Sequence, residues 1–419
     1  MNYRKSLLTA LLAPIIALGT GAVTTVHAAG YAVFTQGASA LGQGNAVTAH
    51  SNDPSTIFYN PALINKLEGT QFQIGTTAIF SSREYESLPG GNSTSKDSVF
   101  FPSTFYATHK FNDKLSAGLG IFNPFGLGTE WDENWDGRYI ATESKLKTFN
   151  INPVVSYQVL PSLSIAAGVD VILLDATLKK KLPSAALAPL GFPAGFDIEQ
   201  KFEGDGTGVG FNVAAAYDLC KHLTLGASYR SEVKVDISGD ATFTNATLTG
   251  LGVPVSALNS GGKTEVKLPQ QVTAAIAYKG IDALTLEVGL RWEDWSAFDQ
   301  LAITLDNGQT SVTPRNWKDS WGLNLGGRYQ YDQTVALLAG YVFGNSAVPD
   351  STFDPSIPDA KTHVFCVGTD LDFRPYTLAF SYGYQLYENR TGNTVGSPLA
   401  DGKFKSDAHL VALSMGYKF

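Results

Sequence analysis

Apolar and polar residues alternate in long stretches of this chain, and this alternation constrains the fold more than any other feature. In the stretch 284–292 the even positions are apolar, whereas the odd positions include Thr285, Glu287 and Arg291. In 223–237 and 317–331 the odd positions carry the apolar residues, with Asp319 as an exception. A period of two residues is that of a β-strand with one apolar and one polar face. The apolar residues of these stretches are Leu284, Leu286, Val288, Leu290 and Trp292; Leu223, Leu225, Tyr229, Val233, Val235 and Ile237; and Trp317, Trp321, Leu323, Leu325, Tyr329 and Tyr331.

Fourteen such segments follow one another along the chain. They begin near residues 70, 99, 114, 146, 162, 203, 222, 263, 283, 317, 334, 361, 375 and 402. Tight turns alternate with longer connections, such as 123–145, 181–202, 241–262 and 344–360. The tight turns are Asn112-Asp113, Leu160-Pro161, Cys220-Lys221, Gly280-Asp282, Tyr331-Gln333 and Arg374-Pro375. An even strand number, with short turns at one end and long loops at the other, predicts an all-β, 14-stranded antiparallel transmembrane β-barrel over residues 69–419.

The apolar faces distinguish this barrel from a soluble β-sandwich, which would also alternate. In a sandwich the apolar face points inwards and the polar face meets water. Here the apolar faces end in aromatic residues, as expected at the two membrane interfaces, and the last strand closes on Tyr417 and Phe419. The opposite faces carry charges of both signs, which suits a hydrated or plugged lumen. We therefore expect the apolar faces to contact lipid.

The first 28 residues have the pattern of a secretory signal peptide. Arg4 and Lys5 precede a largely apolar run, and Val26-His27-Ala28 offers a cleavage site with small residues. Residues 29–68 do not alternate. Asp53-Pro54 and Asn60-Pro61 each place a capping residue before a proline, which indicates short helical turns. A segment of roughly forty residues is the right size for a plug, or hatch, inside a barrel of this strand number.

Composition excludes several other classes of protein. The net charge of −8 argues against a nucleic-acid partner, since that affinity comes mostly from cationic contacts to phosphate. Cys220 and Cys366 are too few for a disulfide framework, and the sequence leaves open whether they pair. The six histidines show no metal-ligand spacing, and no serine–histidine–carboxylate set falls on one lumen rim. We therefore expect neither enzyme activity nor a cofactor or metal.

Short motifs recur in order through nearly the whole mature chain. They are Gly42-Gln43-Gly44-Asn45-Ala46, Asn60-Pro61-Ala62, Pro124-Phe125-Gly126-Leu127 with Trp131, Gly137-Arg138-Tyr139, Asn152-Pro153, Tyr229-Arg230-Ser231-Glu232-Val233-Lys234, Leu268-Pro269, Trp295-Ser296-Ala297-Phe298, Lys318-Asp319 and Ile357-Pro358-Asp359. Together they resemble the FadL/TodX family of hydrophobic-compound transporters. The resemblance implies a monomeric barrel in the Gram-negative outer membrane, among outer-membrane lipids. It also implies transport without ATP: extracellular loops capture the ligand, which passes to an internal site. Rearrangement of the hatch then opens a route to a lateral gap beside a kinked third strand.

Two expected extracellular loops contain apolar residues and no charged residue. The loop 182–196 carries Leu187, Leu190, Phe192 and Phe196, and the loop 241–262 carries Phe243, Leu248 and Leu251. One interpretation is that the two loops simply pack on each other. The other is an apolar docking groove, because an exposed apolar patch usually marks a binding surface. The groove matches the loop pair that the family uses for capture, and we favour it.

The fifth segment combines an inward apolar stripe with a lysine. Strand parity places Ile172, Leu174, Leu178 and Lys180 on the lumen face. A fatty acid needs such a stripe for its chain and a cation for its carboxylate. A lysine run such as 179–181 is, on the other hand, usually just solvated. The resemblance implies a basic residue near the ligand carboxylate at Lys180, with Arg315 or Lys318 as a second cation.

Small residues mark two candidate elements of the transport path. Gly208 and Gly210 belong to a row of glycines on the lumen face of the sixth segment. This row either clears a ligand path or lets the hatch pack closely. Asn60 is either only a helix N-cap or, as the resemblance implies for Asn60-Pro61-Ala62, a hatch element tied to transport.

The sequence therefore predicts passive, ligand-gated uptake of long-chain fatty acids or similar hydrophobic molecules through a plugged barrel. An aromatic-hydrocarbon channel of the same fold is the main alternative. A general porin for hydrophilic solutes is the alternative from another class, and the hatch and the uncharged loops argue against it.

Overall fold

The computed structural model describes residues 30–87, 92–96, 98–392 and 401–419. The expected signal peptide, residues 1–28, lies outside the described residues. Among the helices of the described residues, none is both long and apolar enough to span a membrane.

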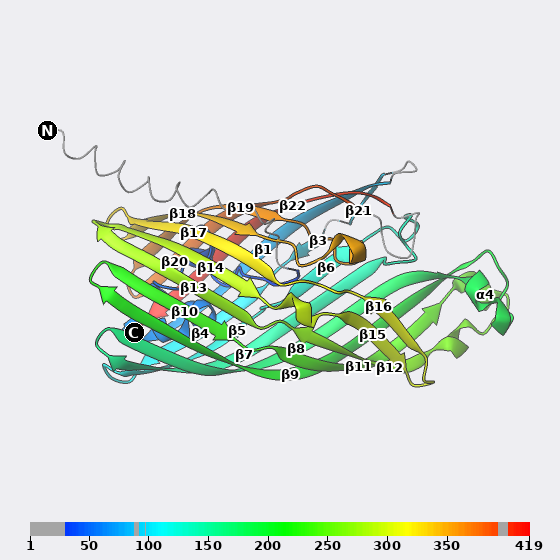
Figure 1. Ribbon diagram of the computed structural model, residues 1–419, viewed down its shortest axis with the longest axis horizontal. Coiled ribbons are helices and arrows are strands. Elements are labelled where there is room, and N and C mark those ends of the chain that lie inside the picture. Colours follow the sequence, from blue (N-terminus) through cyan, green and yellow to red (C-terminus); the bar gives the residue numbers. More distant parts are fainter. Residues whose placement is uncertain (1–29, 88–91, 97, 393–400) are drawn as a thin grey trace.

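Antiparallel pairing closes fourteen strand passes into one barrel (Figure 1). Each pass pairs with its neighbours in the chain, and the last strand, β22, returns to pair with β1. The expected fold class and strand number are therefore confirmed. The passes are β1 (Thr70–Ser87); β3 (Ser98–Phe100) with β4 (Ser103–Lys110); β5 (Leu115–Phe122) with β6 (Gly126–Glu130); β7 (Glu143–Leu160); β8 (Leu163–Pro183); β9 (Asp197–Cys220); β10 (Leu223–Arg230) with β11 (Val233–Thr244); β12 (Ser260–Leu268) with β13 (Gln271–Ile281); β14 (Leu284–Glu293) with β15 (Gln300–Leu305); β16 (Thr310–Pro314) with β17 (Ser320–Gln330); β18 (Val335–Gly344); β19 (Thr362–Phe373); β20 (Tyr376–Tyr387) with β21 (Arg390–Gly392); and β22 (Gly402–Lys418).

The two ends of the barrel differ in their connections. All six expected tight turns lie at one end, on the left in Figure 1. At the other end the strands extend further than the sequence indicated, because β8 runs on to Pro183 and β11 to Thr244. The remaining short elements are β2 (Asn92–Thr94), α2 (Ala38–Gly42), α3 (Thr56–Tyr59), η1 (Pro61–Lys66), η2 (Ser184–Leu190), α4 (Ala246–Gly250), η3 (Val255–Leu258), η4 (Trp295–Ala297) and η5 (Asp350–Thr352).

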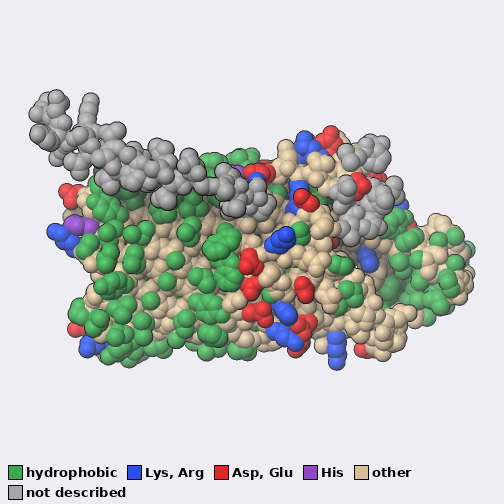
Figure 2. Space-filling model, viewed as in Figure 1, with side chains coloured by type: hydrophobic (Ala, Val, Ile, Leu, Met, Phe, Trp, Pro, Cys, Tyr) green, Lys and Arg blue, Asp and Glu red, His purple; other side chains and the backbone are tan. Residues whose placement is uncertain are grey.

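An apolar band surrounds the half of the barrel next to the tight turns. Outward side chains there are well exposed, with Val209 at 66% and Leu290 at 56%. Exposed aromatics such as Tyr331 and Tyr376 lie at the tight-turn rim. Figure 2 shows this apolar cover, with charged side chains gathered beyond it. An apolar band with aromatic residues along its edge is typical of the outer surface of a membrane β-barrel.

A bulge reverses the faces of the strand pass formed by β10 and β11. Arg230 pairs with Asn212 on β9, whereas Asp236 pairs with Thr207, so the pass has one extra residue between them. One extra residue turns every following side chain to the other face. The single apolar face predicted for 223–237 was therefore wrong. Leu225 faces lipid, but Val233, Val235 and Ile237 are buried inside the barrel.

Trp317 also departs from the predicted pattern, because β17 begins only at Ser320. The Trp317 side chain is buried and packs against Trp295, with 5.2 Å between the ring centroids. Trp321, by contrast, lies on the strand and faces outwards as predicted.

The hydrophobic pattern consequently inverts along the barrel axis. Beyond the apolar band the outer face is polar, with Lys147, Asp175 and Asp205 in register and exposed across β7, β8 and β9. The interior at that level is an apolar cluster that includes Ile172, Val235 and other buried side chains. Beyond the membrane belt the barrel thus encloses a packed apolar core, called here the apolar compartment.

The two cysteines provide a test of this arrangement, because both are free: Cys220 is exposed at the tight-turn end and Cys366 is buried on β19. We expect a maleimide to label one thiol per chain in the folded protein and two after denaturation, as counted by intact-mass spectrometry. Folded protein that takes up no label, or two, would contradict the assigned faces.

Candidate functional site

Residues 30–68, called here the luminal segment, lie inside the ring of strands. Helix α2 packs against β18, β19, β20 and β22, and η1 packs against β5, β7, β8 and β9. The lumen faces of Gly226 on β10 and Gly340 on β18 lie directly against the backbone of Thr48 and Gly44. A side chain at either glycine would push the segment off the wall. The residues expected to form the hatch therefore contact much of the inner wall.

Glu287 on β14 anchors the middle of the luminal segment. Its carboxylate accepts hydrogen bonds from the backbone N–H groups of Thr48, Ala49 and His50, at 2.5, 3.0 and 3.0 Å. The His50 ring lies 2.7 Å from the same carboxylate and 2.9 Å from Gln43 Oε1. Because the Glu287 side chain is fully buried, these contacts replace the hydrogen bonds that its carboxylate would make with water. One wall residue thus satisfies three backbone donors of the segment.

Asn60 caps η1 and also makes hydrogen bonds outside that helix. Its side-chain oxygen accepts a hydrogen bond from the Ala62 N–H at 3.0 Å, which caps η1. Its Nδ2 group donates to the carbonyl oxygens of Thr48 at 2.7 Å and Ala215, on β9, at 3.0 Å. Pro61 and Ala62 are buried beside it. The motif therefore joins two parts of the luminal segment to the wall.

The third strand pass is broken at residues 123–125, between β5 and β6. β5 pairs with β4 on one side, but β6 pairs only with β7. No ladder joins β6 to β3 in the described part of these strands. The luminal segment instead makes hydrogen bonds with the backbone at this break. The Val33 N–H donates to the Pro124 carbonyl, and the Gly126 N–H donates to the Tyr31 carbonyl, both at 2.9 Å. The side chain of Gln36 bonds both the N–H and the carbonyl of Asn123.

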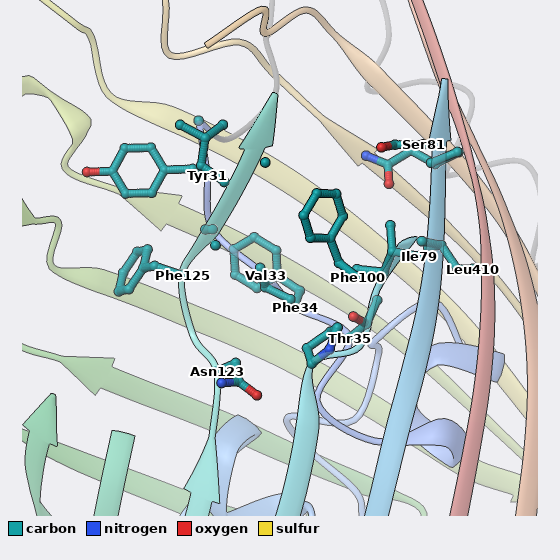
Figure 3. Close-up of a pocket in the computed structure, with 18 of the residues that line it drawn as sticks. Tyr31, Val33, Phe34, Thr35, Ile79, Ser81, Phe100, Asn123, Phe125 and Leu410 are labelled. Carbon is teal, nitrogen blue, oxygen red and sulfur yellow. The ribbon is translucent and has the colours of Figure 1, made fainter. Parts of the chain in front are cut away.

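A cavity of about 790 Å³ lies at this break (Figure 3). Its inner wall includes Phe34, Val342 and Leu410, which face the lumen. It also reaches Lys147 and Phe149 on β7, which face outwards. The cavity therefore passes through the wall at the outer edge of the apolar band. Its volume is within the range of about 300–1,000 Å³ that is common for small-molecule sites.

Phe100 occupies the opening between the second and third strand passes. Its ring lies against Gly128 of β6, where a side chain would clash with it. Arg83 Nη1 spans the same opening and donates to the Gly128 carbonyl at 2.8 Å. Figure 3 shows Phe100 between the luminal segment and β1.

The predicted apolar stripe of β8 does face inwards. Ile172 and Leu174 are fully buried in the apolar cluster, and Leu178 and Lys180 follow on the same face. Lys180 lies beyond the membrane band, whose last exposed apolar residue on β8 is Leu173. Its ammonium has no hydrogen-bond or ion-pair partner among the described residues, and burial lowers its pKa below the ordinary lysine value.

The two uncharged loops pack together over the apolar compartment. Phe192, Phe243 and Leu248 are buried in the same cluster as Ile172, and Leu187 and Phe196 pack against it. Leu190 and Leu251 remain 65% and 66% exposed. In this conformation the loops form a lid with two large apolar side chains on its surface.

The two proposed second cations differ in burial. Arg315 is buried in an ion pair of 2.5 Å with Asp354, and Lys318 is exposed. The space in front of Gly208 and Gly210 is filled by Val233, Val235 and Ser231, from β11 and the bulge before it. In this conformation these glycines therefore accommodate the bulged neighbouring pass rather than a free path or the luminal segment.

The residues predicted as ligand-binding do not line the cavity at the third strand. Sequence reasoning did not select Phe34, Phe100, Asn123 or Arg291, which do line it. Of these four residues, only Arg291 could have been identified from the sequence, because it is a charged residue on the expected lumen face of a predicted strand.

Comparisons with known proteins agree with this architecture. Residues 19–419 match the profile of the outer membrane protein transport family (OMPP1/FadL/TodX). The chain is 26% identical to a long-chain fatty acid transport protein of Escherichia coli, over 94% of this chain and 96% of that protein.

Solved structures of similar fold include a Pseudomonas aeruginosa FadL homologue. Its TM-score is 0.83 at 21% identity, over 93% of this chain and 100% of the other. The toluene transporter TodX of Pseudomonas putida has a TM-score of 0.72 at 18% identity, over 91% and 98%.

The anchor at Glu287 can be tested by substitution. Glu287→Ala leaves three buried N–H groups without an acceptor, each costing about 1–3 kcal/mol. We expect much faster amide hydrogen exchange at residues 46–50 while the barrel strands stay protected. Glu265→Ala is the control, because this side chain lies on the outer face, is 39% exposed and makes its ion pair with Lys234, outside the luminal segment. Unchanged exchange in Glu287→Ala would show that the carboxylate does not hold the segment.

Proposed function

Because the chain belongs to the outer membrane protein transport family (OMPP1/FadL/TodX), we propose that it carries long-chain fatty acids or similar hydrophobic molecules into the cell. Its family places it in the Gram-negative outer membrane as a transport barrel. The substrate class, the gating and the ligand site are our proposal. The single observation that carries it is the 790 Å³ cavity, which connects the lumen to the outer surface through the break in the third strand pass.

The route begins at the loop lid in this proposal. Leu190 and Leu251 offer apolar surface to a ligand arriving from outside. The apolar compartment below, with Ile172, Leu174 and Leu178, holds the chain, and Lys180 holds the carboxylate. The ligand then reaches the cavity at the third strand and leaves sideways. Burying apolar surface at each stage favours the transfer without an energy source.

The luminal segment acts as the hatch of this transporter. Its contacts with the wall narrow the lumen on the tight-turn side, where a polar cavity of about 850 Å³ remains between Asp53 and the strand ends near Asp332 and Asp372. The backbone of residues 31–33 and the side chain of Gln36 also hold the broken third pass, so ligand contact at the cavity reaches the segment directly. The fourteen passes close into one ring through the pairing of β22 with β1, and we propose that one chain suffices.

An aromatic-hydrocarbon channel is the second candidate, since the chain shares its fold with the TodX toluene transporter. The presence of Lys180 favours a fatty acid over a neutral hydrocarbon as the ligand. The Lys180 ammonium is partly buried and has no partner among the described residues, so a carboxylate ligand stabilises it and a neutral ligand does not.

The role of Lys180 predicts a change of ligand preference. Lys180→Glu replaces attraction by repulsion, so we expect hexadecanoic acid to bind at least tenfold more weakly and hexadecane to bind as before. Binding is measured by fluorescence displacement with the purified protein in detergent. Wild-type affinity for the acid should fall as the pH rises through the lowered pKa of Lys180, below the ordinary lysine range.

Lys318→Glu is the matched control, because Lys318 is exposed and lies outside the apolar compartment. If Lys180→Glu lowers the affinity for the acid and the hydrocarbon equally, or changes neither affinity, Lys180 does not bind the carboxylate.

Removal of the luminal segment tests the hatch. A chain lacking residues 30–68 should release small hydrophilic solutes from liposomes rapidly, because the lumen loses the side chains that fill it. The intact chain in the same liposomes is the reference. A truncated barrel that folds but stays impermeable to the solutes would contradict the plug role.

A further inference from the structure

We propose that Arg291 forms a second carboxylate-binding subsite, at the inner end of the cavity beside the third strand. This inference rests on the proposed function and specifies the substrate class further: monocarboxylic acids with a long apolar chain. The residues lie on β14, β17 and the luminal segment, and Lys180 is not among them.

Arg291 points into the lumen from β14. It pairs with Thr273 on β13 and with Gly322 on β17, and its guanidinium lies across Gly322, where a side chain would collide with it. The Arg291 side chain is only 7% exposed. The missing side chain at Gly322 therefore makes room for a buried cation in the wall of the lumen.

The guanidinium has no hydrogen bond among the described residues. Glu293 Oε2 lies 3.5 Å from Arg291 Nε, which makes an ion pair, but Arg291 Nε remains without a hydrogen-bond acceptor. The two Glu293 oxygens already accept hydrogen bonds from Gln271 at 2.9 Å and Ser320 at 3.1 Å. A guanidinium carries five N–H donors, so most of its bonding capacity is unused in a buried place. Such a group stabilises an anion that reaches it.

Phe34 of the luminal segment fixes the orientation of this cation. The Arg291 Cζ atom lies 3.4 Å from the centroid of the Phe34 ring, so the ring covers one face of the guanidinium. Stacking leaves the edge of the guanidinium, which carries the N–H groups, free to meet a carboxylate in its plane.

Arg291 and Phe34 lie at the junction of two cavities. Both line the 790 Å³ cavity, and both also line a smaller one of about 40 Å³. The smaller cavity has mixed walls, in which polar side chains such as Ser228, Thr273 and Arg230 lie beside aromatic rings. It has room for a few water molecules or one carboxylate group. The larger cavity has apolar walls that include Val33, Leu146 and Leu410.

This division matches one ligand chemistry. An alkyl chain fits the large apolar cavity, and a carboxylate at its end reaches Arg291 at the polar junction. Arg230 supplies little additional charge, because it is already paired with Asp170. A neutral hydrocarbon would fill the large cavity equally well but would leave the Arg291 donors unused. The subsite therefore selects for the acid.

Substitution of Arg291 tests the proposal with two probes, hexadecanoic acid and hexadecan-1-ol. In Arg291→Gln we expect the acid to bind about tenfold or more weakly, with the alcohol within a factor of two of wild type. Glu293→Gln removes the competing carboxylate, and the acid should bind a few-fold more tightly. Arg291→Lys keeps the charge without the planar fork and should give an intermediate loss. Retained β-sheet circular dichroism shows that each variant is folded.

The outcomes separate this proposal from the transport function. Equal loss of acid and alcohol in Arg291→Gln would mean that the cavity has collapsed, and an unchanged acid affinity would mean that Arg291 does not meet the carboxylate; either result overturns the subsite. Acid affinity that falls in Glu293→Gln would overturn it as well. If wild-type protein binds neither probe, the proposed function fails before Arg291 is considered.

Discussion

A strand in hydrocarbon must have hydrogen-bond partners along both of its edges, because lipid offers none. The barrel meets this requirement by closing β22 onto β1, and it violates it at one place that the structure describes, residues 123–125 of the third pass. There the luminal segment supplies the missing partners from Tyr31, Val33 and Gln36. The wall and its plug are therefore one hydrogen-bonded unit. A displacement of the first luminal residues would release the broken pass, and the cavity lies at this same point.

The second organising feature is the reversal of the hydrophobic pattern along the barrel axis. In the membrane belt the outside is apolar and the inside holds polar groups such as Asp170, Arg230 and Glu287. Beyond the belt the inside is apolar and the outside is charged. The bulge between Arg230 and Val233 produces this reversal within a single strand pass. In the proposed route, a hydrophobic ligand therefore meets the apolar compartment before it reaches the membrane, and it leaves the barrel where the outer surface is apolar.

The sequence predicted the strand number, the turns and the faces of most strands, because a period of two residues persists wherever one face meets lipid. The prediction of faces failed where one extra residue shifts the register of a strand. In the sequence 223–237, Leu225 and Val235 have the same place in the alternating pattern, although Leu225 faces lipid and Val235 is buried. The stripe of Ile172, Leu174 and Lys180 followed from parity alone. The cavity could not be predicted, since Phe34, Phe100 and Asn123 come from segments whose contacts are non-local. Trp317 was misassigned because its strand begins three residues later.

The treatment of buried charge links these observations to selectivity. Several interior arginines have close carboxylate partners: Arg230 with Asp170, Arg315 with Asp354 and Arg328 with Asp370. Lys180 has no partner among the described residues, and Arg291 has only a loose ion pair. A buried cation without hydrogen bonds lowers the stability of the fold, and an apolar residue of the same size would not. Lys180 borders the outer compartment and Arg291 the lateral cavity. In the proposed route, an acid that moves from the compartment to the cavity passes from Lys180 to Arg291, so its carboxylate has a cationic partner at both sites, whereas a hydrocarbon gains nothing from either cation.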